Sequence, residues 1–93
     1  MRKRTYFSLR GVLILREEKI VDPENIIGSN IRRIRIEKGV GQTELVKQLH
    51  LMNVDITRET LVKIEGEKQH IKLEQLKSIK KILLVDYDEI LIK

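Results

Sequence analysis

Apolar residues recur at helical spacing over 42–49 and again over 57–65, which predicts two short helices joined by a connector. Thr57 can cap the free amides at the start of the second helix, and Gly66 provides a stop signal after it. One face of each helix is therefore apolar and the other polar. The apolar positions are Leu45, Val46 and Leu49 in the first helix and Leu61 and Ile64 in the second.

A longer helix is predicted before this pair, over about 22–37. Asp22 can cap its start, Pro23 suits its first helical position, and Glu24 favours its positive end. Gly39 then provides a left-handed exit from the helix. The core stripe of this helix is Ile27, Ile31 and Ile34.

Two more helices are predicted after the pair. The fourth begins near Leu73, and Asp86 with Glu89 makes a capping box for a short fifth helix. The apolar residues of the fifth helix exceed what one face needs, so we expect them to meet the first helix or a second subunit. The core face of the fourth helix is Leu76, Ile79 and Leu83, and the surplus in the fifth is Ile90, Leu91 and Ile92.

The helix over 57–65 has an outer side with the chemistry of base recognition. Because each residue turns the helix by about 100°, Glu59, Val62 and Lys63 lie opposite the apolar side, and Arg58 lies at its edge. These residues supply an acceptor, methyl groups and two donors, which can read base edges in a major groove. The alternative is an ordinary surface, in which Glu59 and Lys63 form a helix pair contributing ~0.2–0.5 kcal/mol.

Three runs of sequence stand in a fixed order between Ile27 and about Leu91: IGSNIRRIRIEKGVGQTEL, TRETLVKIEGEK and LEQLKSIKKILLVDYDEIL. Together they resemble a lambda-repressor-like helix-turn-helix domain of the Cro and XRE type. The matching features are a Gly after helix one, a Gln opening helix two, a Thr-initiated recognition helix ending in Ile-Glu, and two further helices. The resemblance implies an all-α fold of five helices over 22–93. The amino-terminal arm over 1–21 departs from the family pattern, and its own apolar run suits a strand or hairpin.

The resemblance also implies a function. Its members are transcription regulators, here expected to be a repressor that binds double-stranded DNA as a homodimer on half-sites about 34 Å apart. A cytoplasmic, prokaryotic protein that is nucleoid-associated when bound to DNA is expected. The implied base-reading residues are Arg58, Glu59, Val62 and Lys63, and the implied phosphate-binding residues are Gln42, Thr43, Thr57, Lys68 and Lys72.

One connector and two single residues depart from the family pattern. The connector HLMNVDI is longer than the tight turn of the best-known members, and we expect its Val54 and Ile56 to pack inward. Leu84 stands where the family commonly has Gly, so the turn into the last helix is expected to differ. Gly41 takes the place of the usual Ser or Thr cap of helix two and is nearly as acceptable there.

The net charge of +5 is concentrated at the start of the chain. Residues 1–20 hold six Lys and Arg against two Glu, whereas residues 21–93 hold thirteen basic against twelve acidic residues. The helical part is therefore near neutral, and its basic cluster is either a local basic face or a solvated helix surface. Aromatic residues are too few for a single-strand stacking platform. The cluster consists of Arg32, Arg33, Arg35 and Lys38.

Three roles compete for the arm. Its basic start can reach the minor groove or phosphates, its apolar run over 5–15 can pair with a second copy, or it can be a loose extension. A tight turn at Arg10-Gly11 would divide the run into a hairpin. Ile36 lies opposite the core stripe of the first helix, so the arm is also a candidate to cover it. The residues expected to contact DNA from the arm are Arg2, Lys3 and Arg4.

No pattern in the sequence predicts an enzyme, a metal site or a cofactor. There is no Cys and no glycine-rich phosphate loop, and no Ser has a nearby His to activate it. His50 and His70 are twenty residues apart without acidic or thiolate ligands arranged around them. Arg10 interrupts the only early apolar run, so neither export nor a membrane span is expected. The alternative function is a protein-interaction module or antitoxin-like partner with the same fold.

Overall fold

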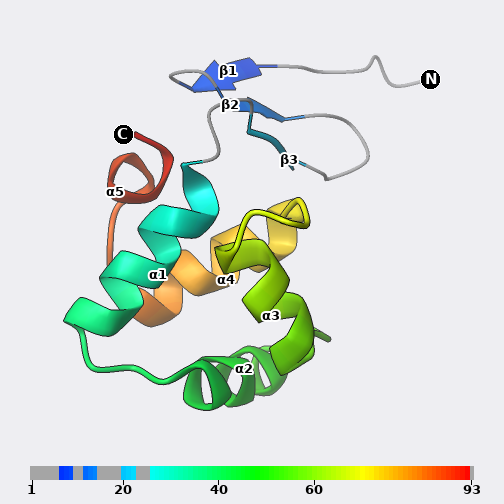
Figure 1. Ribbon diagram of the computed structural model, residues 1–93, viewed down its shortest axis with the longest axis vertical. Helices are drawn as coiled ribbons and strands as arrows, with labels where there is room; N and C mark the ends of the chain where they lie inside the picture. The colour runs from blue at the N-terminus through cyan, green and yellow to red at the C-terminus, as the bar shows by residue number, and fades with distance from the viewer. Residues whose placement is uncertain (1–6, 10–11, 15–19, 23–25, 93) are drawn as a thin grey trace.

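Five helices form the body of the chain, and a small sheet precedes them (Figure 1). The computed structural model describes residues 7–9, 12–14, 20–22 and 26–92. Within 26–92 the predicted number and order of helices are confirmed. The helices are α1 (Ile27–Glu37), α2 (Gln42–Leu51), α3 (Arg58–Glu65), α4 (Leu73–Leu83) and α5 (Tyr87–Leu91).

The first helix begins later than the sequence indicated. It starts at Ile27 rather than near Asp22, and Pro23 and Glu24 lie outside the described residues. Asp22 nevertheless binds the helix start, because its Oδ2 accepts hydrogen bonds from the backbone N–H groups of Ile26 (2.7 Å) and Ile27 (2.6 Å). These amides lack partners within the helix, so a carboxylate beside them stabilises its positive end.

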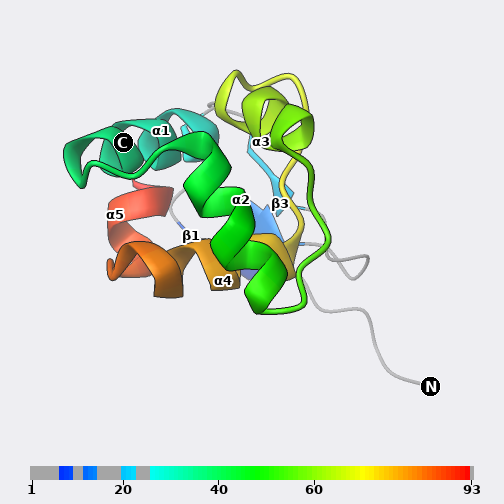
Figure 2. The ribbon, with the colours of Figure 1, turned by 90° about the horizontal axis from the view of Figure 1, so that it is seen from below.

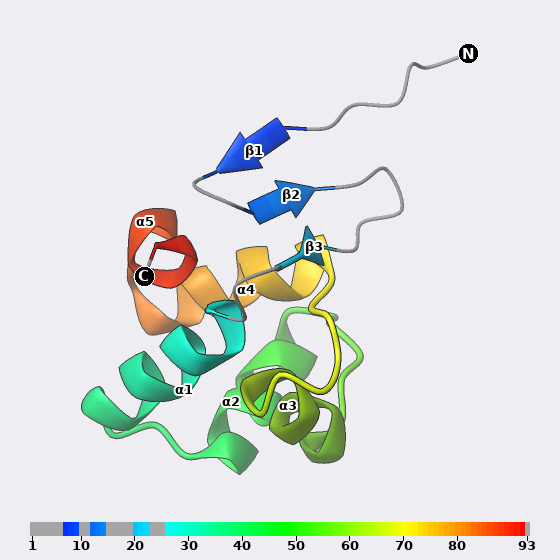
Figure 3. The ribbon, with the colours of Figure 1, turned by 45° about the horizontal axis from the view of Figure 1, so that its top comes forward.

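The amino-terminal arm contains three short antiparallel strands, β1 (Phe7–Leu9), β2 (Val12–Ile14) and β3 (Ile20–Val21), in the order β1-β2-β3. The expected turn at Arg10-Gly11 and the expected DNA contacts Arg2, Lys3 and Arg4 lie outside the described residues. Figure 3 shows the strands beside the start of α1 and at the opposite end of the molecule from α2. Ile36, near the far end of α1, is 51% exposed, so the described strands of the arm do not cover it.

The core between the helices is aliphatic. Val54 and Ile56 of the connector are buried in it, as predicted. Helix α5 packs on α1, where the Asn30 side-chain amide donates to the carbonyls of Ile90 (2.8 Å) and Ile92 (3.0 Å). Each fully buried Leu or Ile side chain contributes about 1.5–3 kcal/mol. The most deeply buried side chains are Ile31, Leu45, Leu49, Leu61, Leu76, Ile79, Leu83 and Ile90.

Four helices end with the same hydrogen-bonded motif. In each, a backbone N–H after the helix bonds the carbonyl five residues earlier, and the residue before that donor has a positive φ. A side chain with a Cβ pays roughly 1–2 kcal/mol for this left-handed conformation, which Gly adopts freely. Gly39 was predicted correctly, whereas the stop signal assigned to Gly66 belongs to the next residue. The left-handed residues are Gly39 (φ 73°), Asn53 (φ 63°), Glu67 (φ 64°) and Leu84 (φ 58°).

Candidate nucleic-acid interface

Helix α3 begins at the cap that the sequence predicted. The Thr57 hydroxyl accepts a hydrogen bond from the Thr60 backbone N–H at 3.0 Å. Ile56 precedes the cap and Leu61 follows it, and both are buried, so apolar contacts fix the direction in which the chain enters the helix. Thr57 itself is exposed and can still face a phosphate.

All four side chains expected to read bases lie on the exposed side of α3. Arg58, Glu59 and Lys63 are exposed, and Val62 is 43% exposed although it is apolar. Among the described residues, ion pairs join Arg33 to Glu37 and Arg35 to Glu65, and none joins Glu59 to Lys63. The simple helix pair considered for Glu59 and Lys63 is therefore not formed, and both side chains face solvent.

The inner side of α3 is fixed by a close approach to α1 at Gly28. A Cβ at Gly28 would overlap the Ile64 carbonyl oxygen and would lie 2.9 Å from the carbonyl carbon. Only a residue without a side chain fits this contact, so the backbones of α1 and α3 lie directly against each other. This contact therefore sets the distance between α1 and α3.

A buried ion pair also joins α1 and α3. The Arg35 guanidinium donates to both carboxylate oxygens of Glu65, from Nε to Oε2 at 2.7 Å and from Nη2 to Oε1 at 2.9 Å. Its Nη1 donates to the Val40 carbonyl at 2.8 Å. The two-pronged geometry satisfies both charges inside the protein. Including Arg35 in a possible basic face was therefore wrong, because this side chain is buried beneath α3.

The sequence carries a signal for this pair in the positions of the two charged residues. Arg35 follows Ile31 by four residues and Ile34 by one, which places it on the buried stripe of α1. Glu65 follows Leu61 by four residues and so lies on the buried stripe of α3. Two opposite charges at buried positions of neighbouring helices indicate an internal ion pair, since single buried charges are strongly disfavoured.

The start of α2 reaches the end of α3 through Gln42. The Gln42 side-chain amide donates to Glu65 Oε1 at 3.1 Å, so this residue is partly engaged inside the protein rather than wholly available for phosphate. Thr43 is exposed. The residue before the helix, Gly41, has no side chain to cap the first amides of α2. Those amides and the Thr43 hydroxyl are the groups that could bind an anion here.

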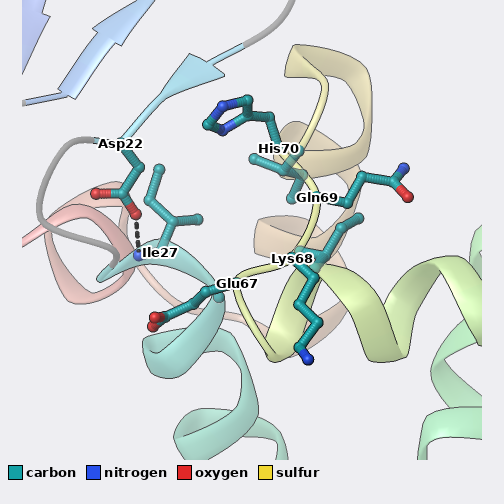
Figure 4. A pocket seen from close by; sticks show the side chains of 9 residues that line it. Asp22, Ile27, Glu67, Lys68, Gln69 and His70 are labelled. Atoms are coloured by element: carbon teal, nitrogen blue, oxygen red, sulfur yellow. Dashed lines mark hydrogen bonds between the residues drawn. The ribbon is translucent and has the colours of Figure 1, made fainter.

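Lys68 and Lys72 follow α3 and are both exposed. A cavity of about 140 Å³ lies between Asp22, the start of α1 and the segment 67–71, and Lys68 is one of the residues around it. Figure 4 shows the Lys68 and Gln69 side chains directed away from this cavity, while Asp22 points to the start of α1. The Glu67 carboxylate accepts a hydrogen bond from the Ser29 hydroxyl, which ties this segment to α1. The Lys68 ammonium is thus presented outward.

The long connector between α2 and α3 is well anchored. Asn53 takes a left-handed conformation, and its successor Val54 donates to the Leu49 carbonyl at 2.9 Å. A His50 ring nitrogen lies 2.6 Å from the Ile56 carbonyl oxygen, which gives this histidine a structural role. The extra length therefore forms an ordered loop at one end of the helix pair.

The structure thus gathers most of the predicted DNA-contacting residues around α2 and α3, which lie side by side (Figure 2). Gln42 and Thr43 lie at the carboxyl end of α3, because Gln42 bonds to Glu65. Lys68 follows that end, and Thr57 occupies the other.

A comparison of the chain with protein-family models, with curated proteins and with solved structures finds no match in any of the three. None of the helices in the described part of the chain combines the length and the apolar character needed to cross a membrane. Residues 26–92 form a small domain of five helices in which one side of α3 is buried and the other is exposed.

Proposed function

We propose that this protein is a lambda-repressor-like helix-turn-helix regulator that binds a specific sequence of duplex DNA and represses transcription. In this proposal α3 enters the major groove, and α2 lies across its entrance. Two copies read two half-sites about 34 Å apart on one face of the DNA.

The observation that carries the proposal is the contrast between the two sides of α3. Its inner side is held by a capped start, a backbone contact at Gly28 and a buried ion pair at Glu65. Its outer side presents exposed side chains that have no ion-pair partner among the described residues. A rigid helix with an open polar side is what readout of base edges requires.

Each exposed residue of α3 has a role in this proposal. Arg58 and Lys63 donate to guanine, Glu59 accepts from the cytosine amino group, and Val62 contacts a thymine methyl. A good two-pronged base contact discriminates against the wrong base by ~1–3 kcal/mol. Phosphate contacts come from exposed groups around the helix, and these set register and salt dependence. They are Thr43, Thr57, Lys68 and Lys72, together with the amides at the start of α2 and the remaining hydrogen-bonding capacity of Gln42.

Selection from a random library of duplex DNA, with the whole protein at near-physiological salt, tests this function. We expect enrichment of a pseudo-palindrome with half-sites about one helical turn apart. Enrichment of a single ungapped site would support recognition of DNA by the protein but contradict binding as a symmetric dimer. No enrichment by protein shown to be folded by circular dichroism would contradict the proposal.

The second candidate is a protein-interaction module or antitoxin-like partner, which the exposed apolar residues Val62 and Leu51 favour. The two functions differ in their response to salt. Binding to DNA weakens steeply as salt rises because counterions are released, whereas an apolar protein interface changes little. A titration of the binding partner at several salt concentrations therefore separates them.

A further inference from the structure

Three side chains on the outer side of α3 stand in a fixed angular order. Because successive residues of an α-helix are turned by about 100°, Val62 lies about 60° before Glu59 and about 100° before Lys63 in a view down the helix axis. All three side chains are exposed. Around the outer side of α3, an apolar group is therefore followed by a hydrogen-bond acceptor and then by a hydrogen-bond donor.

Val62 is the fixed member of this set. It is the one exposed apolar residue of α3, at 43%. A β-branched side chain has one strongly preferred rotamer in a helix, so the methyl groups of Val62 keep their place relative to the backbone. Within the described part of the chain, neither Glu59 nor Lys63 forms an ion pair, so both longer side chains can turn toward a ligand beside Val62.

Each base pair of duplex DNA shows a fixed order of groups across its major groove. A thymine–adenine pair shows a methyl group, an acceptor, a donor and an acceptor, whereas a cytosine–guanine pair shows a donor and two acceptors. Methylation of cytosine at C5 adds a methyl group where thymine carries its own. The order of the methylated pair is then methyl, donor, acceptor and acceptor.

The order of groups on α3 matches the methylated pair and neither of the other two. A helix that lies in the groove meets these groups in angular order, because rotation about its axis runs across the groove. Val62 then contacts the methyl group, Glu59 accepts from the cytosine amino group, and Lys63 donates to guanine O6 or N7. On a thymine–adenine pair the Glu59 carboxylate would face the thymine O4 acceptor, and on unmethylated cytosine Val62 would have no methyl group to contact.

We propose that the outer side of α3 reads 5-methylcytosine paired with guanine, through Val62 at the methyl group, Glu59 at the amino group and Lys63 at the guanine. The methyl group that Val62 contacts then belongs to the cytosine that Glu59 reads rather than to a thymine. The inference rests on the proposed function and deepens it, because it names the modified base that the site prefers. Occupancy of the DNA site then depends on its methylation.

A comparison of methylated and unmethylated duplexes tests the inference. The binding site is first obtained with the whole protein by selection from two random duplex libraries, one with cytosine and one with 5-methylcytosine in its place. Fluorescence anisotropy then measures affinity for duplexes methylated at one cytosine of each half-site at a time. At one position methylation should tighten binding about fourfold, as burial of one further apolar carbon does. A thymine–adenine pair at that position should bind about tenfold more weakly than the methylated pair.

Variants of α3 separate the two contacts. Val62→Ala withdraws the contact to the methyl group, so methylation should tighten its binding by less than about twofold. The matched control Leu51→Ala also shortens an exposed apolar side chain, but on α2, and should keep the full gain on methylation. Glu59→Ala should lose most of the discrimination between the methylated pair and thymine–adenine.

The outcomes distinguish the inference from the function on which it rests. Methylation that tightens binding at no cytosine of the selected site would overturn the inference and leave sequence-specific binding of DNA in place. So would a gain on methylation that is as large in Val62→Ala as in the wild type. No enrichment from either library by folded protein would contradict the proposed function and the inference together.

Discussion

The two sides of α3 differ in how they depend on the rest of the molecule. Leu61, Ile64 and Glu65 on the inner side are buried and contact α1, α2 and the core. Arg58, Glu59 and Lys63 on the outer side are exposed. The inner side therefore determines whether the helix is held in place, and the outer side can change without loss of the fold. Substitutions on the two sides should separate stability from binding.

Removal of the buried carboxylate should have the largest effect on stability. Glu65→Ala leaves the Arg35 guanidinium buried without a charge partner, which should lower the free energy of unfolding by about 3–5 kcal/mol. Urea denaturation followed by circular dichroism measures the change. The double variant Arg35→Met/Glu65→Leu removes both charges and should be markedly more stable than Glu65→Ala. If the two variants lost the same free energy of unfolding, the unpaired charge of Arg35 would not be the cause of the loss in Glu65→Ala.

A methyl group at the contact between α1 and α3 should have the next largest effect. Gly28→Ala must push the helices apart, because the Ile64 carbonyl occupies the space, and it should lower the free energy of unfolding by about 1–3 kcal/mol or more. Gly41→Ala is the control, since its Cβ meets nothing within 4 Å and its φ is −76°. It should lose less than about 1 kcal/mol. Thermal denaturation measures both variants, and similar losses of stability in Gly28→Ala and Gly41→Ala would contradict the close contact between Gly28 and Ile64.

Loss of the α3 cap should have a smaller effect. Thr57→Val keeps the size of the side chain but removes the acceptor of the Thr60 amide, at a cost of about 1 kcal/mol in unfolding free energy. Thr57→Ser retains the hydroxyl and should remain close to wild type. If chemical denaturation gave the two variants the same midpoint, the hydroxyl would not be the source of the stability.

The sequence predicted the helices well because their signals are local. The isoleucine stripe of α1 and the cap at Thr57 depend on residues within one or two turns, and both are seen. The Gly28 contact joins residues far apart in the chain and has no local signal. For the Arg35–Glu65 pair, the local pattern places each charge on a buried stripe, but which charge it meets depends on how α1 and α3 pack. The exposed side of α3 was predicted from helical rotation alone, because the rotation per residue determines which side chains lie on the same side of a helix.

Two further differences have physical causes. The start of α1 was placed too early, because a carboxylate at Asp22 can reach the amides of Ile26 and Ile27 without being the adjacent cap. The left-handed residue after α3 was placed at Gly66, because glycine is the residue most able to adopt that conformation. The hydrogen bond from Ser29 to Glu67 is a tertiary contact that the local sequence does not reveal.

The most direct test of the central claim compares two double variants on the site obtained by selection. Arg58→Ala/Lys63→Ala removes two positive charges from the outer side of α3. Arg32→Ala/Lys77→Ala removes one arginine and one lysine as well, but from exposed positions on α1 and α4. Both should change the free energy of unfolding by no more than about 0.5 kcal/mol per substitution. Fluorescence anisotropy should show that only the α3 variant loses its preference for the selected site over a scrambled duplex. A preference that survives in the α3 variant, or that is lost equally in both, would contradict base reading by α3.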